Sequence, residues 1–361
     1  MNLKKQIFKI LLLSLIFVSC TDNDTSEIDN SKRYEDGFLI SAEGNFQAKD
    51  GSISYVSNDY SNTSNFIYKS ANGAQLGGLI QSVAFNEDKA YVVLNDVNTL
   101  VVVDKFTLVK KRVITEGLGN PRYMTVVGDK GYVTNWGDGN DETDDFIAII
   151  DLVLNKFVGT IPVENGPERI VAKGDKLYVS HQGAFGSNNI ISVIDTASSN
   201  SVSTITVKDN PDEMFFISTG ELVVLSQGKP LGYGGPPNYE VTSNTTSAIS
   251  FIDVTTNSVE REIEFIENTS ASLLAYSDNK LYYYMSSTSK VYEIEQNATA
   301  LATEGVDVGS VYGMNVHEGK LYTLKYAFQD LSQLDVINFT TKANLYSTAV
   351  GLGASKIYFT E

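Results

Sequence analysis

The chain has 361 residues and a formal net charge of −17. Because binding to nucleic-acid phosphates requires a basic surface, this charge argues against a nucleic-acid partner and otherwise indicates mainly solubility. Apolar residues make up 42% of the chain, enough for a packed core, and the single cysteine excludes an intramolecular disulfide. Beyond the N-terminus, no stretch approaches the roughly 20 apolar residues of a membrane-spanning helix.

The first 19 residues predict an export signal. Lys4 and Lys5 form a basic segment, and residues 10–18 form an apolar segment that is too short to span a bilayer. Ser19 and the lone Cys20 follow directly, and this arrangement resembles the lipobox of bacterial lipoproteins. The resemblance implies that Cys20 is lipidated and becomes the mature N-terminus. The alternative is an ordinary signal peptide with an incidental cysteine.

Residues 20–36 are predicted to form a flexible tether between this anchor and the folded domain. Residues 21–30 are polar and acidic and contain no aromatic residue, so they cannot bury enough surface to fold. An acidic stretch directly after the lipidated cysteine resembles the surface-export signal of Bacteroidota-type lipoproteins. That resemblance implies a protein anchored in the outer membrane and exposed at the cell surface.

From residue 37 onward the chain repeats a unit of about 40–50 residues. Pro121, Pro167 and Pro211 each precede a short apolar strand, a turn and a second strand such as Tyr132-Val133-Thr134-Asn135. A third strand that ends in aspartate and a β-branched fourth strand complete the unit. Four short antiparallel strands in a unit of this length are typical of a propeller blade.

Counting the units predicts an all-β fold, a single seven-bladed β-propeller that spans residues 37–361. Residues 37–70 supply the second to fourth strands of one blade, and residues 354–359 supply its missing first strand. Pairing the C-terminal strand with the N-terminal blade closes the ring and leaves no open sheet edge. The six remaining first strands are expected near Val83, Met124, Ile170, Met214, Leu274 and Met314.

The second-strand motif Tyr132-Val133-Thr134-Asn135 resembles the YVTN repeat of YncE-like seven-bladed propellers, over nearly all of residues 37–361. The motifs Glu43-Gly44-Asn45-Phe46, Asn135-Trp136-Gly137-Asp138-Gly139 and Val311-Tyr312-Gly313-Met314 resemble blade motifs of Bacteroidota-type surface lipoproteins. This resemblance implies a lipoprotein that binds a corrinoid such as cobalamin (vitamin B12) and caps a TonB-dependent outer-membrane transporter. A glycan or a siderophore is the alternative ligand, and the identity of the transporter stays open.

The candidate binding surface follows from blade geometry. The loop after each second strand and the connection into the next blade open on one face, and that face carries the long loops 137–145, 183–189 and 227–246. Aromatic residues among Gly and Asn suit a large ligand with apolar faces and polar edges. The predicted ligand-binding residues are Glu43, Asn45, Phe46, Asn95, Arg122, Trp136, Asp138, Arg169, His181, Gln182, Phe185, Gln227, Tyr233, Tyr239, Tyr312 and Tyr326.

Several of these residues have a structural alternative. Trp136 either stacks on a ligand ring or plugs the central channel. Arg122 and Arg169 either grip anionic groups or form ion pairs with nearby carboxylates. His181 either donates a hydrogen bond to a ligand or is a satisfied polar residue of the scaffold, and metal ligation by it is disfavoured.

Catalysis is not indicated by any motif. The chain lacks a Gly-x-Ser-x-Gly elbow, a His-Glu-x-x-His pair and a phosphate-binding loop, so we expect a binding protein without a cofactor. The acidic run 138–145 lacks the glycine and distal glutamate of an EF-hand, which favours a solvated loop over a calcium site. Two alternatives stay open: a protein-binding scaffold of the cell envelope, and a metal-dependent lactonase or lyase that uses Glu43, Asn95 and Asp212.

Overall fold

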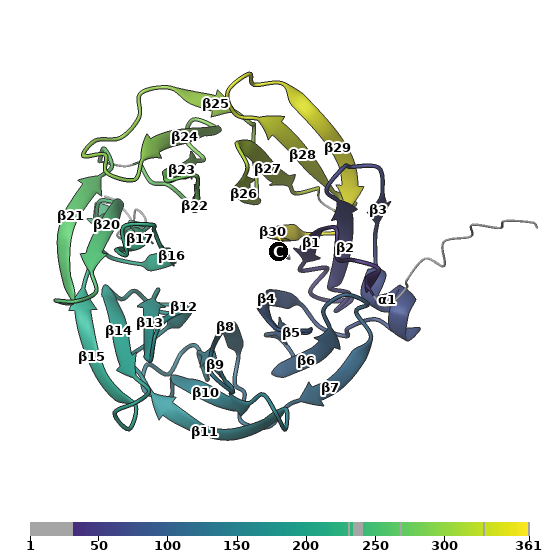
Figure 1. Cartoon of the computed structure of the whole chain (residues 1–361). Helices are drawn as coiled ribbons and strands as arrows, with labels where there is room; N and C mark the ends of the chain where they lie inside the picture. The colour runs from purple at the N-terminus through teal and green to yellow at the C-terminus, as the bar shows by residue number, and fades with distance from the viewer. Residues whose placement is uncertain (1–31, 230–231, 234–240, 268, 328, 360–361) are drawn as a thin grey trace, which may run out of the picture.

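The structure is a computed structural model that describes residues 32–229, 232–233, 241–267, 269–327 and 329–359. The expected signal peptide, the expected lipidation site Cys20 and most of the expected tether lie outside these residues. The described residues form seven four-stranded antiparallel sheets arranged as blades around a central channel (Figure 1). This arrangement confirms the predicted all-β, seven-bladed propeller. The strand pair β18 (Gly232–Tyr233) and β19 (Val241–Ser243) forms a small separate sheet.

The innermost strand of each blade lines the channel (Figure 1). In ring order these strands are β30 (Ala354–Phe359), β4 (Ile80–Asn86), β8 (Pro121–Val127), β12 (Pro167–Lys173), β16 (Pro211–Phe216), β22 (Leu273–Ser277) and β26 (Gly313–His317). The second strands are β1 (Gly37–Ala42), β5 (Lys89–Leu94), β9 (Lys130–Asn135), β13 (Lys176–His181), β17 (Leu222–Ser226), β23 (Lys280–Met285) and β27 (Lys320–Lys325).

The two outer strands of each blade follow in the same order. The third strands are β2 (Ser52–Ser57), β6 (Thr99–Asp104), β10 (Phe146–Asp151), β14 (Ile190–Asp195), β20 (Ala248–Asp253), β24 (Lys290–Glu295) and β28 (Ser332–Asn338). The fourth strands are β3 (Thr63–Ser64), β7 (Lys110–Ile114), β11 (Lys156–Pro162), β15 (Ser201–Thr206), β21 (Ser258–Glu264), β25 (Gly305–Asp307) and β29 (Asn344–Val350).

A short helix, α1 (Ile67–Asn72), follows β3 and was not expected from the sequence. Its buried residues Ile67 and Tyr68 join the apolar cluster between the first and second blades. No helix within the described ranges has the length and apolarity of a membrane span.

The ring is closed by the two ends of the chain. Strand β30 pairs antiparallel with β1, with Phe38 opposite Phe359 and Ile40 opposite Ile357. The last strand therefore becomes the inner strand of the blade that holds the first three strands, as predicted. Figure 1 shows β30 beside the channel, next to β1. This pairing protects strand edges that would otherwise be open to aggregation.

The core is divided into layers between the blades. Seven apolar clusters of described residues each join two neighbouring blades. The second strands have both faces covered, so consecutive residues along them are buried rather than alternately buried and exposed. The tyrosines that recur in the second strands are buried in these layers: Tyr91, Tyr132, Tyr178, Tyr282 and Tyr322.

One end of the ring, here called the rim face, carries the longer loops. Strand direction alternates within each blade, so every loop after a second strand and every connection between blades leaves from this same end. The rim face consists of those connections and of the loops 43–51, 95–98, 136–145, 182–189, 227–247, 286–289 and 326–331, as far as they are described.

Candidate functional site

The inner strands begin with a distortion that directs charged side chains into the channel. Pro121 starts β8, and Arg122 and Tyr123 then lie opposite the single residue Thr134 of the second strand. The same β-bulge follows Pro167 and Pro211. A bulge bends the strand and re-aims its side chains, and proline at a strand start costs no ladder hydrogen bond.

The hydroxyl of the second strand fills the gap that the bulge leaves. Thr134 Oγ1 accepts a hydrogen bond from the Tyr123 amide at 2.9 Å and donates one to the Glu168 carbonyl oxygen at 2.7 Å. Ser180 Oγ accepts from the Arg169 amide at 3.1 Å in the next blade. The small polar residue of the repeat motif thus holds the charged residues of the inner strands in place.

These charged residues form a network of ion pairs around the channel. Arg122 donates two hydrogen bonds to Glu168, from Nε at 2.8 Å and from Nη2 at 3.1 Å. Arg169 donates from Nε to Asp212 at 2.9 Å and from Nη2 to Glu213 at 3.0 Å. The two arginines are therefore committed to carboxylates of the protein, which is the structural alternative considered from the sequence. Burial raises the pKa of Glu213 to about 7 despite the contact with Arg169.

Trp136 closes over one of these pairs. The Arg122 guanidinium carbon lies 3.9 Å from the centre of its ring, and its Nε1 donates to the Pro167 carbonyl oxygen at 3.0 Å. Phe185 packs edge-on against it with ring centres 6.1 Å apart. Trp136 is only 8% exposed, whereas Phe185 is 73% exposed. The ring offered to solvent at this point of the rim is therefore Phe185.

Other exposed aromatic rings lie on the same face. Tyr312 and Tyr326 are 45% and 52% exposed, with ring centres 5.6 Å apart. The Tyr312 hydroxyl donates to Glu43 Oε2 at 2.9 Å, which links the last blade to the first. Phe46, in the loop after β1, is 70% exposed. Four predicted aromatic residues thus stand exposed at one end of the ring.

A groove in the rim face joins the first three blades. Its volume is about 420 Å³, and Phe46, Lys49, Asn95, Asn98 and Asn120 are among its lining residues. Gly137, directly after Trp136, also lines it. Phe46 and Asn95, predicted from different blades, are therefore brought to one groove. Apolar contact and amide groups are combined there, as in many small-molecule sites.

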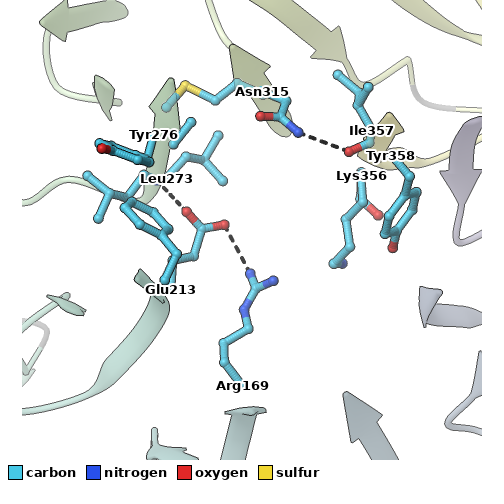
Figure 2. Close-up of a pocket in the computed structure, with 13 residues that line it drawn as sticks. Arg169, Glu213, Leu273, Tyr276, Asn315, Lys356, Ile357 and Tyr358 are labelled. Carbon is cyan, nitrogen blue, oxygen red and sulfur yellow. Dashed lines mark hydrogen bonds and ion pairs between the residues drawn. The ribbon is translucent and has the colours of Figure 1, made fainter. Parts of the chain in front are cut away.

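A second cavity, of about 300 Å³, lies in the central channel (Figure 2). Inner strands from five blades line it, and its walls include Arg169, Glu213, Phe215, Tyr276 and Lys356. Phe215 and Tyr276 stack with ring centres 5.7 Å apart. The side chains of Lys356 and Arg169 extend toward the middle of the cavity in Figure 2.

His181 was expected on the rim, but the structure buries it completely. Its Nδ1 lies 3.1 Å from the Asn165 carbonyl oxygen and its Nε2 lies 2.9 Å from Ser192 Oγ. Burial lowers the pKa of His181 to about 4, so the ring is neutral. The equivalent Asn135 is buried too, and its Oδ1 accepts from the Gly119 amide. Both side chains hold a connection between blades, so the expectation that His181 contacts a ligand is not met in this structure.

Other predicted residues are engaged in the loops themselves. Asn45 Oδ1 accepts from the amides of the next turn, and Asp138 Oδ1 accepts from the Asn140 amide at 3.1 Å. Gln227 Nε2 donates to Asp212 at 3.0 Å, which ties the rim to the charged network. Gln182 is half-buried on the rim. Tyr239 lies outside the described residues, and of Tyr233 only the backbone, in β18, is described.

Two of the residues considered for metal-dependent catalysis, Glu43 and Asp212, are engaged in hydrogen bonds within the protein. Glu43 accepts from Tyr312, and Asp212 accepts from Arg169 and Gln227. Within the part of the chain that the structure describes, no three His, Cys, Asp or Glu side chains are grouped to hold a metal ion. In the acidic run, Asp141 Oδ1 accepts from the Thr143 amide and hydroxyl, as in an ordinary turn.

Sequence reasoning missed three residues of the channel. Glu213, Lys356 and Tyr123 were not among the candidates, yet they face the channel together with Arg169. For Glu213 and Tyr123 the available signal was the pair of residues after each proline, because a bulge turns both of them away from strict alternation. Lys356 lies on a strand without proline, so this signal does not extend to it.

Comparisons with known proteins agree with the fold. A family model described as a domain of unknown function (DUF5074) matches residues 36–210, which hold the first four blades apart from β30. No curated protein sequence matches the chain.

Three solved structures illustrate the fold likeness. Hydrazine synthase of Kuenenia stuttgartiensis is 16% identical, with a TM-score of 0.60, over 76% of this chain and 87% of that one. Dihydro-heme d1 dehydrogenase NirN, in complex with DHE, is 12% identical, with a TM-score of 0.55, over 89% and 74%. Apo AztD from Citrobacter koseri is 13% identical, with a TM-score of 0.52, over 89% and 97%. At these identities the likeness concerns the fold alone.

Proposed function

We propose that this protein is a non-catalytic, lipid-anchored binding protein of the outer-membrane surface that captures a small nutrient on its rim face. The observation that carries the proposal is the exposure of four aromatic rings, Phe46, Phe185, Tyr312 and Tyr326, on that one end of the ring. Large exposed apolar groups gathered on one surface indicate an interaction site rather than chance exposure. The anchor would be Cys20, and the captured nutrient would pass to a TonB-dependent transporter.

The ligand proposed is a corrinoid. A corrin ring has extended faces and an edge of amide side chains, which matches exposed rings interspersed with side-chain amides. Phe46 and Asn95 in the rim groove, and Phe185 with the nearby Gln182, offer this combination on two sides of the channel mouth. Rigid aromatic side chains give contact area at low entropic cost. The sequence resemblance to cobalamin-capturing lipoproteins supports the same ligand.

A calorimetric titration tests this proposal. The full-length protein, in detergent micelles, is titrated with cyanocobalamin and, separately, with cobinamide, which lacks the nucleotide loop. We expect saturable binding of both, since the rim contacts address the corrin ring. The absence of binding at high micromolar concentration would refute the corrinoid. A rim face that instead binds only an envelope protein would favour the scaffold alternative.

A further inference from the structure

Among the residues that the structure describes, Lys356 is a cation of the central channel without a paired carboxylate. Arg122 is paired with Glu168, and Arg169 is paired with Asp212 and Glu213. Lys356, on the inner strand β30, makes no ion pair or hydrogen bond with any of the described residues. Its nearest aromatic contact is the Tyr123 ring, whose centre lies 5.6 Å from Nζ. Lys356 is half-buried, and a cation held partly away from water gains from a counter-ion, so a partner is expected.

The surroundings of Lys356 define what that partner must be. The cavity that Lys356 enters has a volume of about 300 Å³, enough for a small organic molecule (Figure 2). Phe215 and Tyr276 stack on one wall, and Leu273, Met314 and Ile357 add apolar surface. A ligand that fits must therefore carry one negative charge for the ammonium and an apolar body for the walls.

We infer that the channel cavity binds a small monocarboxylate with an apolar or aromatic body, whose carboxylate pairs with the Lys356 ammonium. The adjacent Ser355 also lines the cavity, and its buried hydroxyl has no hydrogen-bond partner among the described residues. The cavity is formed by inner strands rather than by rim loops, and Arg169 is the predicted corrinoid-binding residue that lines it. The monocarboxylate is tested with a different probe, so its failure can be told apart from a failure of corrinoid capture.

The local electrostatics favour an anion at Lys356, and the Glu213 carboxylate on the wall of the same cavity is already paired with Arg169. Burial and the nearby Arg169 lower the pKa of Lys356 to about 8, so the side chain is charged at neutral pH but poorly stabilised. Arg122 acts in the same direction, and Glu43 and Glu168 act against it without contacting the ammonium. A bound carboxylate would supply the direct partner that these more distant groups do not.

The test compares two probes that differ in charge alone. Phenylacetate and phenylacetamide have nearly the same shape, and each is titrated calorimetrically into the full-length protein at neutral pH. We expect phenylacetate to bind about tenfold more tightly or better, because a charge-assisted hydrogen bond contributes that much. Equal affinities for the two probes, or no phenylacetate binding at millimolar concentration, would overturn the inference without any variant.

Two variants then test whether the Lys356 ammonium is the charge that binds phenylacetate. Lys356→Met keeps the length of the side chain and should abolish the preference for phenylacetate, with folding checked by near-ultraviolet circular dichroism. The matched control is Lys173→Met, which removes the same charge at the far end of an inner strand, where Lys173 Nζ donates to the Gly220 carbonyl oxygen at 2.6 Å. Unchanged phenylacetate affinity in folded Lys356→Met would exclude Lys356, and an equal loss in Lys173→Met would point to a general charge effect.

Discussion

The Arg122 guanidinium carbon lies 3.9 Å from the centre of the Trp136 ring, while its nitrogens hold Glu168. This contact joins the rim face to the charged lining of the channel. Trp136 shields the ion pair from solvent, which strengthens the attraction between the two charges. If one partner is removed, the other charge is left buried and unpaired, which destabilises the fold.

Replacing Trp136 by Ala should lower the free energy of unfolding by about 3 kcal/mol, since a large buried ring is lost and a cavity remains. Trp136→Phe keeps a ring against Arg122 but loses the hydrogen bond from Nε1 to Pro167, so about 1 kcal/mol is expected. Urea denaturation of both variants measures the difference. Small and equal losses of unfolding free energy in both variants would mean that the indole ring does not contribute to packing.

Replacing Glu168 by Gln should destabilise the protein by about 3 kcal/mol, because Arg122 is then left buried without a full counter-charge. The control is Glu264→Gln, which weakens the exposed pair of Lys208 and Glu264 and should have little effect. Parallel denaturation curves compare the two. A loss at Glu168 no larger than that at Glu264 would contradict the importance assigned to the channel network.

His181 makes the stability of the fold dependent on pH. Its pKa is about 4 in the folded protein and 6.5 in the unfolded chain, so the unfolded state binds more protons between these values. Stability should therefore fall as the pH drops from 6.5 to 4, by about 3 kcal/mol relative to a variant without the imidazole. His181→Asn is that variant, because Asn135 occupies the equivalent position.

The measurement is the difference in unfolding free energy between wild type and His181→Asn at neutral and acidic pH. Asp145 and Glu213, whose pKa values burial raises to about 7, act in the opposite direction. Both are present in the two proteins, so their effects cancel. A difference that does not change with pH would show that His181 is not held neutral.

The exposed rim rings should matter for the ligand and not for the fold. Phe185→Ala and Tyr326→Ala are each expected to weaken corrinoid binding about tenfold, with no measurable change in thermal stability. Leu154→Ala removes an exposed apolar group from a turn on the opposite face and serves as control. Calorimetric titration of the three variants with cyanocobalamin measures these affinities. Equal affinity in all of them would move the site away from these loops.

The architecture could be predicted from sequence because its determinants are local and repeated. Pro121, Pro167 and Pro211 mark inner strands, and the second-strand tyrosines mark the layers between blades. Even the pairing of β30 with β1 followed from an incomplete first unit. Helix α1 was missed, since its six residues give too short a pattern to distinguish from a loop.

The site was predicted less well, for a physical reason. Blade geometry placed the ends of the second strands on the rim, but the direction of each side chain there depends on its local hydrogen bonds. His181 points into the protein, where its Nε2 lies next to Ser192 Oγ, and Trp136 covers Arg122. For exposed loop residues such as Phe46 and Phe185, it was enough to predict which face of the propeller their loop lies on. Both lie exposed on the rim face, as expected.

The most direct test of the proposed rim site is backbone hydrogen exchange of the full-length protein with and without saturating cyanocobalamin. We expect slower exchange in the rim loops 136–145 and 182–189, and no change in the opposite turns 128–130 and 152–155. Protection confined to those opposite turns, or no protection of any segment at a concentration that saturates a corrinoid site, would refute corrinoid capture on the rim face.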